Sequence, residues 1–255
     1  MHVAAILRLV PDTREELEVD ASGRDIDREW VGMRLSEFDD QALEEAVLLK
    51  ERSGAKVTAI ALAGEGVDRL LQTAVARGVD EVVRVVHDIA DSRDTARQVE
   101  ALAGALHRIG ADVVLTGVMT PEDILGQLAG TLAGRLGWPV FNAVTSVAAE
   151  GDGLRLRQEY SGGRAAIFDV SGPVVIGVQS ASQAPRYVAG SKLRQAAGTP
   201  IGQEEIPTRA PAAAAAITGL SLVEAGGQAV SLEGDATTIA GKIIAILSEK
   251  GLIGA

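Results

Sequence analysis

The amino-acid sequence predicts an α/β fold, in which a mostly parallel sheet carries helices on both faces and is followed by a C-terminal arm. Segments with strand-like and helix-like patterns alternate four times between residues 3 and 136 and are joined by short links. This order favours parallel strands with right-handed crossovers. The core must be aliphatic, because 47% of the residues are hydrophobic but only 3% are aromatic.

The parallel strands are expected at short apolar runs over residues 3–9, 56–62, 81–86 and 112–117. Continuous apolar runs of this length are typical of strands that are buried on both faces. Pro11 closes the first strand, and a polar excursion over residues 15–34 follows, with Gly23 at a hairpin turn.

Helices are expected to follow these strands. Asp39 or Asp40 should cap the first helix, and the second covers residues 67–77. The third helix runs from a cap at Ser92 to Gly110, and the fourth opens at Thr120 and Pro121 and ends near Leu136.

After Pro139 the pattern changes to short segments between glycine-rich turns, at 143–149, 154–160, 165–170 and 174–178. They predict a meander joined to the parallel sheet. From Gln183 the strand pattern is lost, residues 207–216 form an Ala/Pro linker, and a last amphipathic helix is expected at about 235–249. We therefore expect a domain over residues 1–190 and an arm over residues 191–255.

Composition excludes several classes of protein. The sequence has no cysteine, which removes disulfides, thiolate nucleophiles and Cys-based metal sites. The formal net charge of −11 argues against a nucleic-acid-binding protein. No apolar run approaches the ~20 residues of a membrane span, so we expect no membrane insertion and take a cytoplasmic protein as the default.

Catalytic and metal-binding signatures are also missing. No G-x-G-x-x-G motif follows a strand, and there is no Walker loop or nucleophile elbow. His2, His87 and His107 lack the spacing of metal ligands and are expected at the surface. We expect no catalytic residue and no metal site, so the chain alone does not resemble an enzyme.

The most informative segment, residues 116–139, predicts a strand, a loop and a helix. Ligands of open α/β sheets bind outside the carboxyl ends of the strands, and a helix N-terminus offers N–H groups to a phosphate. Glycines at 126, 130 and 134 form a stripe that a strand, a ligand or another helix can approach closely.

Simpler interpretations of this segment stay open. Thr120 and Asp123 also match a capping box, in which both side chains only satisfy backbone donors. The glycine stripe equally suits plain packing of the helix on the sheet.

Several motifs follow one another along the chain. They are Val-Pro-Asp-Thr at 10–13, LSEFDDQALEEAVLLKE at 35–51, QTAVARGVD at 72–80, Trp-Pro at 138–139 and PRYVAGSKLRQAAGTPI at 185–201. Together, and in this order, they resemble the beta subunit of electron-transfer flavoproteins. The resemblance covers about residues 3–201 and is far more specific than any one motif.

The resemblance implies a Rossmann-like, adenine-nucleotide-binding domain with an electron-carrier role. In that family the beta subunit pairs with an alpha subunit, which carries most contacts to a shared FAD, and its C-terminal arm embraces this partner. Electrons pass from a flavoprotein dehydrogenase to a quinone oxidoreductase. The beta subunit usually buries AMP, and a second FAD takes that place in bifurcating members.

Carried over position by position, the resemblance implies a cofactor pocket formed by Ile6, Ser36, Phe38, Asp39, Leu62, Val118, Asp123, Gly126, Gln127 and Leu128. Phe38 matches an aromatic residue on the flavin side. Gly126 and Leu128 replace the common Asn and Thr of the family, and Arg8 replaces its Lys. Because the changes at Gly126 and Leu128 remove polar side chains that could hold a phosphate, AMP, a second FAD and an empty site all stay open.

The partner-recognition loop also departs from the family. Gly190 stands where the family has a Leu that anchors acyl-CoA dehydrogenases, and the lysine cluster is reduced to Lys192 and Arg194. Loss of an apolar anchor should weaken that docking. Residues 195–201 look more like relatives that serve amine-oxidising flavoproteins, so we hypothesise a dehydrogenase that oxidises an N-methyl amine.

Two other classes of protein were weighed against the residues. A stand-alone adenine-nucleotide-binding regulator of the universal-stress type would share the parallel sheet but would not need the arm. A nucleotide hydrolase would need a phosphate loop and a catalytic group, and the sequence shows neither. The terminal helix favours an obligate heterodimer, because its Ile-rich face must be covered.

Overall fold

The computed structural model of the chain describes residues 1–89, 93–123, 125–207, 217–223 and 229–253. Contacts within the chain divide it into two units, Met1–Gly219 and Leu220–Ala255. The sequence-based division into a domain over 1–190 and an arm over 191–255 stays a prediction, because its boundary is placed where the expected partner-recognition loop begins.

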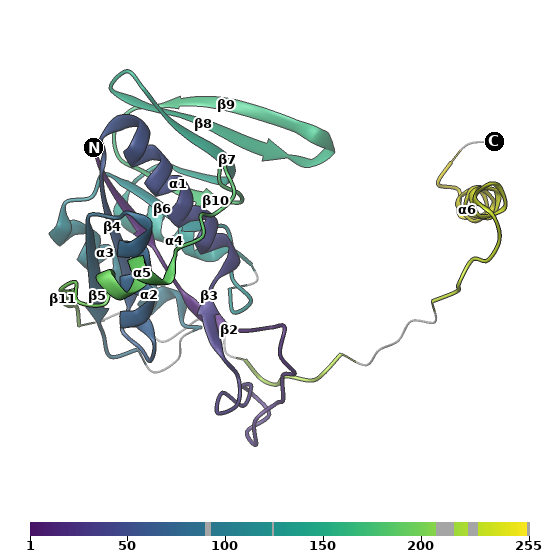
Figure 1. The fold of residues 1–255 in the computed structure, drawn as a ribbon, viewed down its shortest axis with the longest axis horizontal. Helices are drawn as coiled ribbons and strands as arrows, with labels where there is room; N and C mark the ends of the chain where they lie inside the picture. Colours follow the sequence, from purple (N-terminus) through teal and green to yellow (C-terminus); the bar gives the residue numbers. More distant parts are fainter. Residues whose placement is uncertain (90–92, 124, 208–216, 224–228, 254–255) are drawn as a thin grey trace. The chain divides into compact units, whose positions relative to one another are not determined.

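The first unit is built on a nine-stranded sheet with the order β11-β5-β4-β1-β6-β10-β7-β8-β9 (Figure 1). Neighbours from β11 to β7 are parallel, whereas β7, β8 and β9 form an antiparallel meander. The bounds are β1 His2–Ile6, β4 Lys56–Leu62, β5 Glu81–Val86, β6 Val113–Gly117, β7 Val140–Glu150, β8 Gly153–Tyr160, β9 Arg164–Val170, β10 Val174–Val178 and β11 Gly202–Glu205. The mostly parallel sheet and the meander predicted from the sequence are confirmed.

Helices cover both faces of this sheet. Their bounds are α1 Glu37–Ser53, α2 Val67–Arg77, α3 Thr95–Ile109, α4 Gln127–Leu136 and α5 Gly190–Ala196. Successive side chains of a strand point to opposite faces, and β1 shows this clearly. Val3 and Ala5 pack in one core with α1 and α2, whereas Ala4 and Ile6 pack in the other with α3 and α4. The predicted α/β fold class is confirmed.

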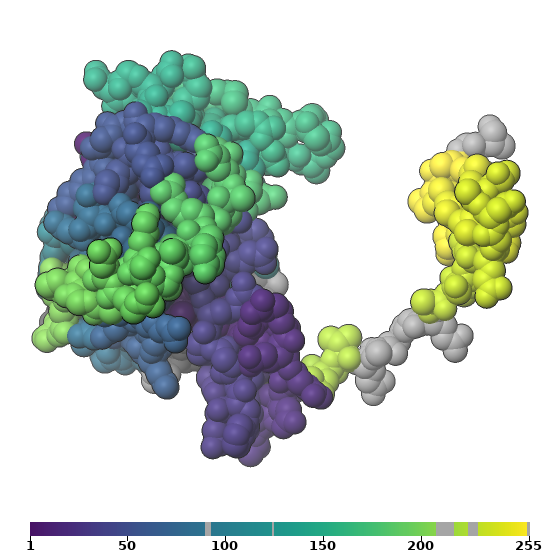
Figure 2. All heavy atoms as spheres, in the orientation of Figure 1, coloured from purple at the N-terminus to yellow at the C-terminus, as the bar shows by residue number. Residues whose placement is uncertain are grey.

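The predicted first strand is in fact two strands. β1 ends at Ile6, and β2, Leu9–Pro11, turns away to pair antiparallel with β3, Met33–Leu35. The polar excursion predicted over residues 15–34 ends where β3 begins, and we call the segment between β2 and β3, residues 12–32, the excursion. It projects from the body of the first unit and is purple in Figure 2. The hairpin turn expected at Gly23 is confirmed, because this residue has φ 68° and Val19 bridges Ile26 beside it.

Two predicted helix starts are wrong. α1 begins at Glu37 with Ser36 as its N-cap residue, so neither Asp39 nor Asp40 caps it. α4 begins at Gln127 and not at Thr120, because Gly126 takes a left-handed conformation (φ 60°) immediately before the helix. The predicted cap at Ser92 lies outside the described residues, and α3 begins after Asp94, which accepts a hydrogen bond from the Arg97 amide.

The region after residue 183 contains elements that the sequence pattern did not reveal. α5 packs against α2, and β11 pairs in parallel with β5. β11 reads Gly-Gln-Glu-Glu and is mostly exposed, since it joins the sheet at its edge through backbone hydrogen bonds. β11 is therefore a strand without an apolar pattern, and the expectation that no strand follows residue 183 is wrong.

The second unit contains α6, Ala236–Glu249, close to the predicted span of 235–249. Asp235 caps it by accepting a hydrogen bond of 2.8 Å from the Thr238 amide. No described residue of α6 is buried, and Ile243, Ile244 and Ile246 are exposed within this unit. The predicted linker at 207–216 lies outside the described residues, except for Pro207. Among the described helices, none is long and apolar enough to cross a membrane.

Gly117 permits the close approach of β6 to the first turn of α1. A Cβ atom at this position would lie 2.6 Å from the Phe38 Cβ and carbonyl carbon and 2.7 Å from the Asp39 nitrogen. We expect Gly117→Ala to lower the free energy of unfolding by about 1–3 kcal/mol, as overpacking does, in urea denaturation.

Gly130→Ala is the matched control within α4. A Cβ atom there would meet no described atom within 4 Å, so this change should stabilise the helix by about 0.5–1 kcal/mol. Equal effects of the two substitutions would contradict the packing argument.

Candidate functional site

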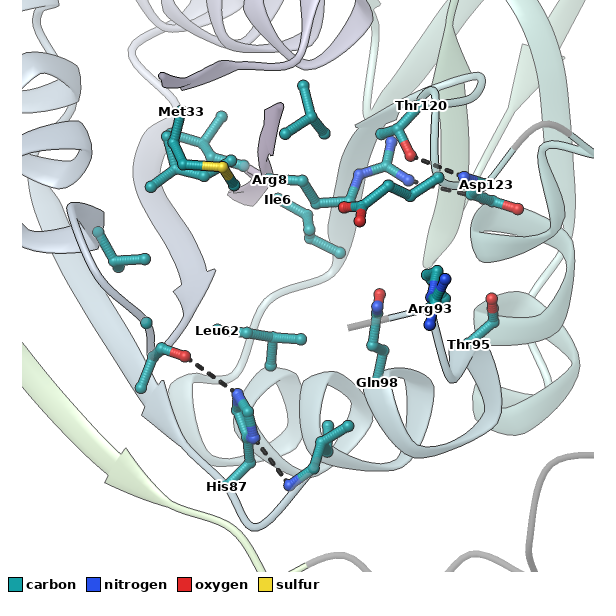
Figure 3. Close-up of a pocket in the computed structure, with 18 of the residues that line it drawn as sticks. Ile6, Arg8, Met33, Leu62, His87, Arg93, Thr95, Gln98, Thr120 and Asp123 are labelled. Carbon is teal, nitrogen blue, oxygen red and sulfur yellow. Dashed lines mark hydrogen bonds and ion pairs between the residues drawn. The ribbon is translucent and has the colours of Figure 1, made fainter. Parts of the chain in front are cut away.

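A pocket of about 660 Å³ opens at the carboxyl ends of β1, β4 and β5 (Figure 3). Here the chain runs from β1 to β4 and β5 on one side of β1, and then returns to β6 on its other side. Open parallel sheets bind ligands at such a switch in strand order, and the volume lies within the ~300–1,000 Å³ of small-molecule sites.

The wall of the pocket has an apolar part and a polar part. The apolar side chains come from strand ends, α2, α3 and the excursion's flanks: Ile6, Leu9, Met33, Leu62, Val67, Ile89 and Leu102. The polar and charged side chains are Arg8, Asp25, Arg28, Glu65, His87, Arg93, Thr95, Gln98, Thr120, Glu122 and Asp123. Such a wall suits a ligand with an apolar ring system and a charged group.

Arg8 links the pocket to the protein core. Its Nε and Nη2 donate to the two carboxylate oxygens of Asp39, both at 2.8 Å, and Nη2 also donates to the Gly117 carbonyl at 3.2 Å. The Arg8 amide donates to the same carboxylate at 3.0 Å, and the Gly117 amide does so at 2.7 Å. One carboxylate thus holds together the ends of β1 and β6 and the start of α1.

Electrostatic interactions keep the Arg8 guanidinium charged. The Asp39 side chain is fully buried and that of Arg8 is 12% exposed. Burial by itself lowers the pKa of Arg8, but the charge and hydrogen bonds of Asp39, with a smaller contribution from Asp123, outweigh burial and raise the pKa above its usual value. The Arg8 guanidinium therefore stays a fixed cation in the pocket wall.

Asp123 caps the start of α4. Its Oδ1 accepts a hydrogen bond from the Gln127 amide at 3.0 Å, and its Oδ2 accepts one from the Leu128 amide at 3.2 Å. The Thr120 hydroxyl accepts from the Asp123 amide at 3.0 Å. Both side chains accept from backbone amides, as the capping interpretation predicted. The reciprocal capping box is not formed, because Asp123 reaches forward to α4 and not back to Thr120, and Asp123 also pairs with Arg8.

The glycine stripe of α4 does not pack against the sheet. A Cβ atom at Gly130 or Gly134 would meet no described atom within 4 Å, so a close approach there is absent from the described part of the chain. Gly126 differs, because a Cβ atom would lie 2.5 Å from the Val118 carbonyl oxygen. Its role is to let the loop turn into the helix.

The residues predicted to bind a cofactor fall into two groups. Ile6, Leu62 and Asp123 line the pocket. The others are not among its lining residues and lie at the start of α1 or around the start of α4: Ser36, Phe38, Asp39, Val118, Gly126, Gln127 and Leu128. Leu128 is buried in the core with α3, and the Ser36 hydroxyl has no hydrogen-bond partner among the described residues. Their part in binding stays a prediction.

Sequence reasoning missed several residues of the pocket wall. Gln98 points from α3 into the cavity (Figure 3). His87, expected at the surface, is partly buried there, with Nε2 3.2 Å from the Ala63 carbonyl and Nδ1 accepting from the Ile89 amide at 3.0 Å. The polar pattern around these residues gave no signal of a pocket. Among the described residues, no cluster of His, Asp and Glu is suited to a metal ion.

A chain of ion pairs joins the excursion to two other segments of the pocket wall. We call Asp25, Arg28, Arg93 and Glu122 the mouth cluster. Arg28 Nη2 lies 2.5 Å from Glu122 and 3.2 Å from Asp25, and Arg93 lies 3.6 Å from Asp25. Burial lowers the pKa of Arg28, but Glu122 and Asp25 raise it by more, so its net shift is upward.

Two further buried carboxylates of α1 anchor the segment after β10. Glu45 accepts hydrogen bonds from the amides of Val147 (2.6 Å) and Ser182 (2.7 Å). Glu44 pairs with Arg186, which also pairs with Glu51. The hydrogen bonds that Arg186 donates to Glu51 and Glu44 raise its pKa. The acidic motif at 35–51 therefore serves the fold on the side of α1 that faces this segment.

Residues 25–222 match the electron transfer flavoprotein domain family. The chain is 28% identical over 269 residues to "Electron transfer flavoprotein subunit beta" of Methylophilus methylotrophus, covering 98% of each chain. Proteins of the same name from Clostridium acetobutylicum (29% identity, 76% of this chain and 74% of the relative) and Syntrophomonas wolfei (31%, 67% of both) are also similar.

The Arg8–Asp39 pair predicts a strong asymmetry between single and double substitutions. Asp39→Leu leaves a buried cation without its partner and should lower the free energy of unfolding by about 3–5 kcal/mol. Replacing both residues, as Arg8→Met with Asp39→Leu, should cost clearly less than the two single changes together.

Urea denaturation of the single and double variants measures this coupling. The exposed pair Arg135–Glu100, at 2.8 Å, is the control and should show little coupling. Strict additivity at Arg8 and Asp39 would contradict the structural role assigned to this pair.

Proposed function

The chain belongs to the electron-transfer flavoprotein domain family and is an electron-carrier subunit, and from this premise we propose that it is the beta subunit of a heterodimer. The observation that carries the proposal is its similarity to named beta subunits along nearly the whole chain. The partner is an alpha subunit, and the two chains together hold one FAD. FAD supplies the ability to take up and release electrons singly.

Assembly with an alpha subunit is supported by α6. An isoleucine-rich face left exposed within its own unit needs a cover, since large apolar patches on proteins mark interaction sites. We propose that the second unit, Leu220–Ala255, contributes this face to the alpha subunit.

The pocket is proposed to hold an adenine nucleotide, with AMP as the ligand. Support comes from its place at the switch in strand order, its volume of about 660 Å³ and its division into an apolar wall and a charged wall. Ile6 and Leu62 would contact the base or ribose, while cations of the wall face the phosphate. A second FAD in this pocket would instead make the protein a bifurcating member of the family.

The electron route is proposed to run from a flavoprotein dehydrogenase to a quinone oxidoreductase, with the heterodimer in the cytoplasm. The dehydrogenase is proposed to oxidise an N-methyl amine. Gly190 opens α5, where it supplies no apolar anchor, and Lys192 and Arg194 on the same helix are exposed. Rapid reduction of the heterodimer by an acyl-CoA dehydrogenase, beside poor reduction by an N-methyl amine dehydrogenase, would contradict the choice of substrate.

The first test is to co-express the chain with an alpha subunit, purify the complex and quantify the nucleotides that it releases. We expect one FAD and one AMP per heterodimer, with a flavin spectrum in the visible range. Two FAD per heterodimer would identify a bifurcating protein. A colourless homodimer that binds ATP without a partner would favour the universal-stress type of regulator.

The second test concerns α6. Deleting residues 217–255 should weaken co-purification with the alpha subunit, because the apolar face is lost. Ile243→Asp together with Ile246→Asp should act in the same direction by placing charges on that face, whereas Ser248→Asp on the same helix should have little effect. Unchanged co-purification of both the deletion and the double variant would contradict the proposed contact between α6 and the alpha subunit.

A further inference from the structure

The start of α4 offers few donors to a phosphate in this chain. The amides of Gln127 and Leu128 already donate to the Asp123 carboxylate. Gly126 and Leu128 carry no polar side chain that could replace those donors. A phosphate that approached this helix would also meet the negative charge of Asp123, so its main contact should lie elsewhere in the pocket.

Arg8 is also committed to other partners. Two of its nitrogens form a fork with Asp39, and its Nη1 lies 3.6 Å from Asp123. Releasing this fork would leave the Asp39 carboxylate buried without a counter-ion, which is strongly unfavourable. Arg8 can therefore contribute its field to the pocket, but it is poorly placed to exchange its partner for a ligand.

Arg28 differs from Arg8 in both burial and attachment. It lies in the pocket wall but comes from the excursion, and its side chain is 33% exposed. The side chains of its partners Asp25 and Glu122 are 31% and 16% exposed, whereas that of Asp39, the partner of Arg8, is fully buried. Exchange of Glu122 for a ligand's phosphate would release a carboxylate that keeps some access to solvent, unlike the fully buried carboxylate of Asp39.

We propose that Arg28 binds the phosphate of the pocket's ligand, and that Glu122 is a competing carboxylate that occupies Arg28 when no phosphate is bound. This inference rests on the proposed nucleotide pocket. The ligand's phosphate is then bound by the excursion and not by the N-terminus of α4. The pocket therefore selects a nucleoside monophosphate over the uncharged nucleoside.

The experiment uses the heterodimer from which the nucleotide of the proposed pocket has been removed. AMP and adenosine are then titrated in separate calorimetric measurements. Arg28→Gln should weaken AMP binding by about 10- to 100-fold, the range of a charged hydrogen-bonded contact. Its effect on adenosine should be small. Glu122→Gln should tighten AMP binding, because the competing carboxylate is gone, and should leave adenosine binding unchanged.

Arg135→Gln and Glu100→Gln are the matched controls, since this exposed Arg–Glu pair lies outside the pocket wall. Neither should alter the binding of AMP or adenosine. The opposite signs at Arg28 and Glu122 distinguish a ligand contact from a structural ion pair, because breaking a structural pair at either end would act in the same direction.

Three outcomes would overturn the inference. If both pocket variants weaken AMP and adenosine alike, the mouth cluster only holds the wall in place. If the wild-type heterodimer binds AMP and Arg28→Gln binds it equally well, the phosphate contact lies elsewhere while the nucleotide pocket stands. If the wild-type heterodimer binds no AMP, the proposed nucleotide pocket fails together with the inference.

Discussion

The rest of the first unit depends on one buried ion pair, between Arg8 and Asp39. The carboxylate accepts hydrogen bonds from the Arg8 side chain and amide and from the Gly117 amide. Neighbouring strands therefore end at fixed positions around the start of α1. Because Gly117 has no side chain, α1 can lie close enough to β6 for these bonds to form. The hydrogen bonds of Asp39 also fix the position of Arg8 in the pocket wall.

The same helix carries further buried carboxylates, and they explain why α1 is acidic on its inner side. Glu45 accepts hydrogen bonds from backbone amides of β7 and of the segment after β10. Glu44 forms an ion pair with Arg186. A buried carboxylate is tolerable only when hydrogen bonds satisfy it. Glu44 and Glu45 of the motif at 35–51 therefore anchor the fold, and no described residue of this motif lines the pocket.

The regular elements were predictable from the sequence because apolar periodicity and glycine stops marked them. The spans 56–62, 67–77 and 81–86 agree with β4, α2 and β5 to the residue. The failures have physical causes. Ser36 takes the N-cap position although two aspartates follow it, and Asp39 is engaged by Arg8. β11 joins the sheet through its backbone, so its side chains carry no signal. Of the cofactor residues named from the family, Ile6, Leu62 and Asp123 line the pocket. Arg28 also lines it, but this residue could not be predicted, because the polar sequence of the excursion has no periodic pattern that would indicate its fold.

The polar strand β11 has a consequence for how the chain behaves before it meets a partner. The unpaired edge of a sheet is a template for a strand of another molecule. This edge presents Gln203, Glu204 and Glu205, and Glu204 is already tied to Arg108 at 2.8 Å. A second copy approaching edge to edge would set carboxylate against carboxylate. Pairing of two copies through β11 is therefore disfavoured at this edge of the sheet.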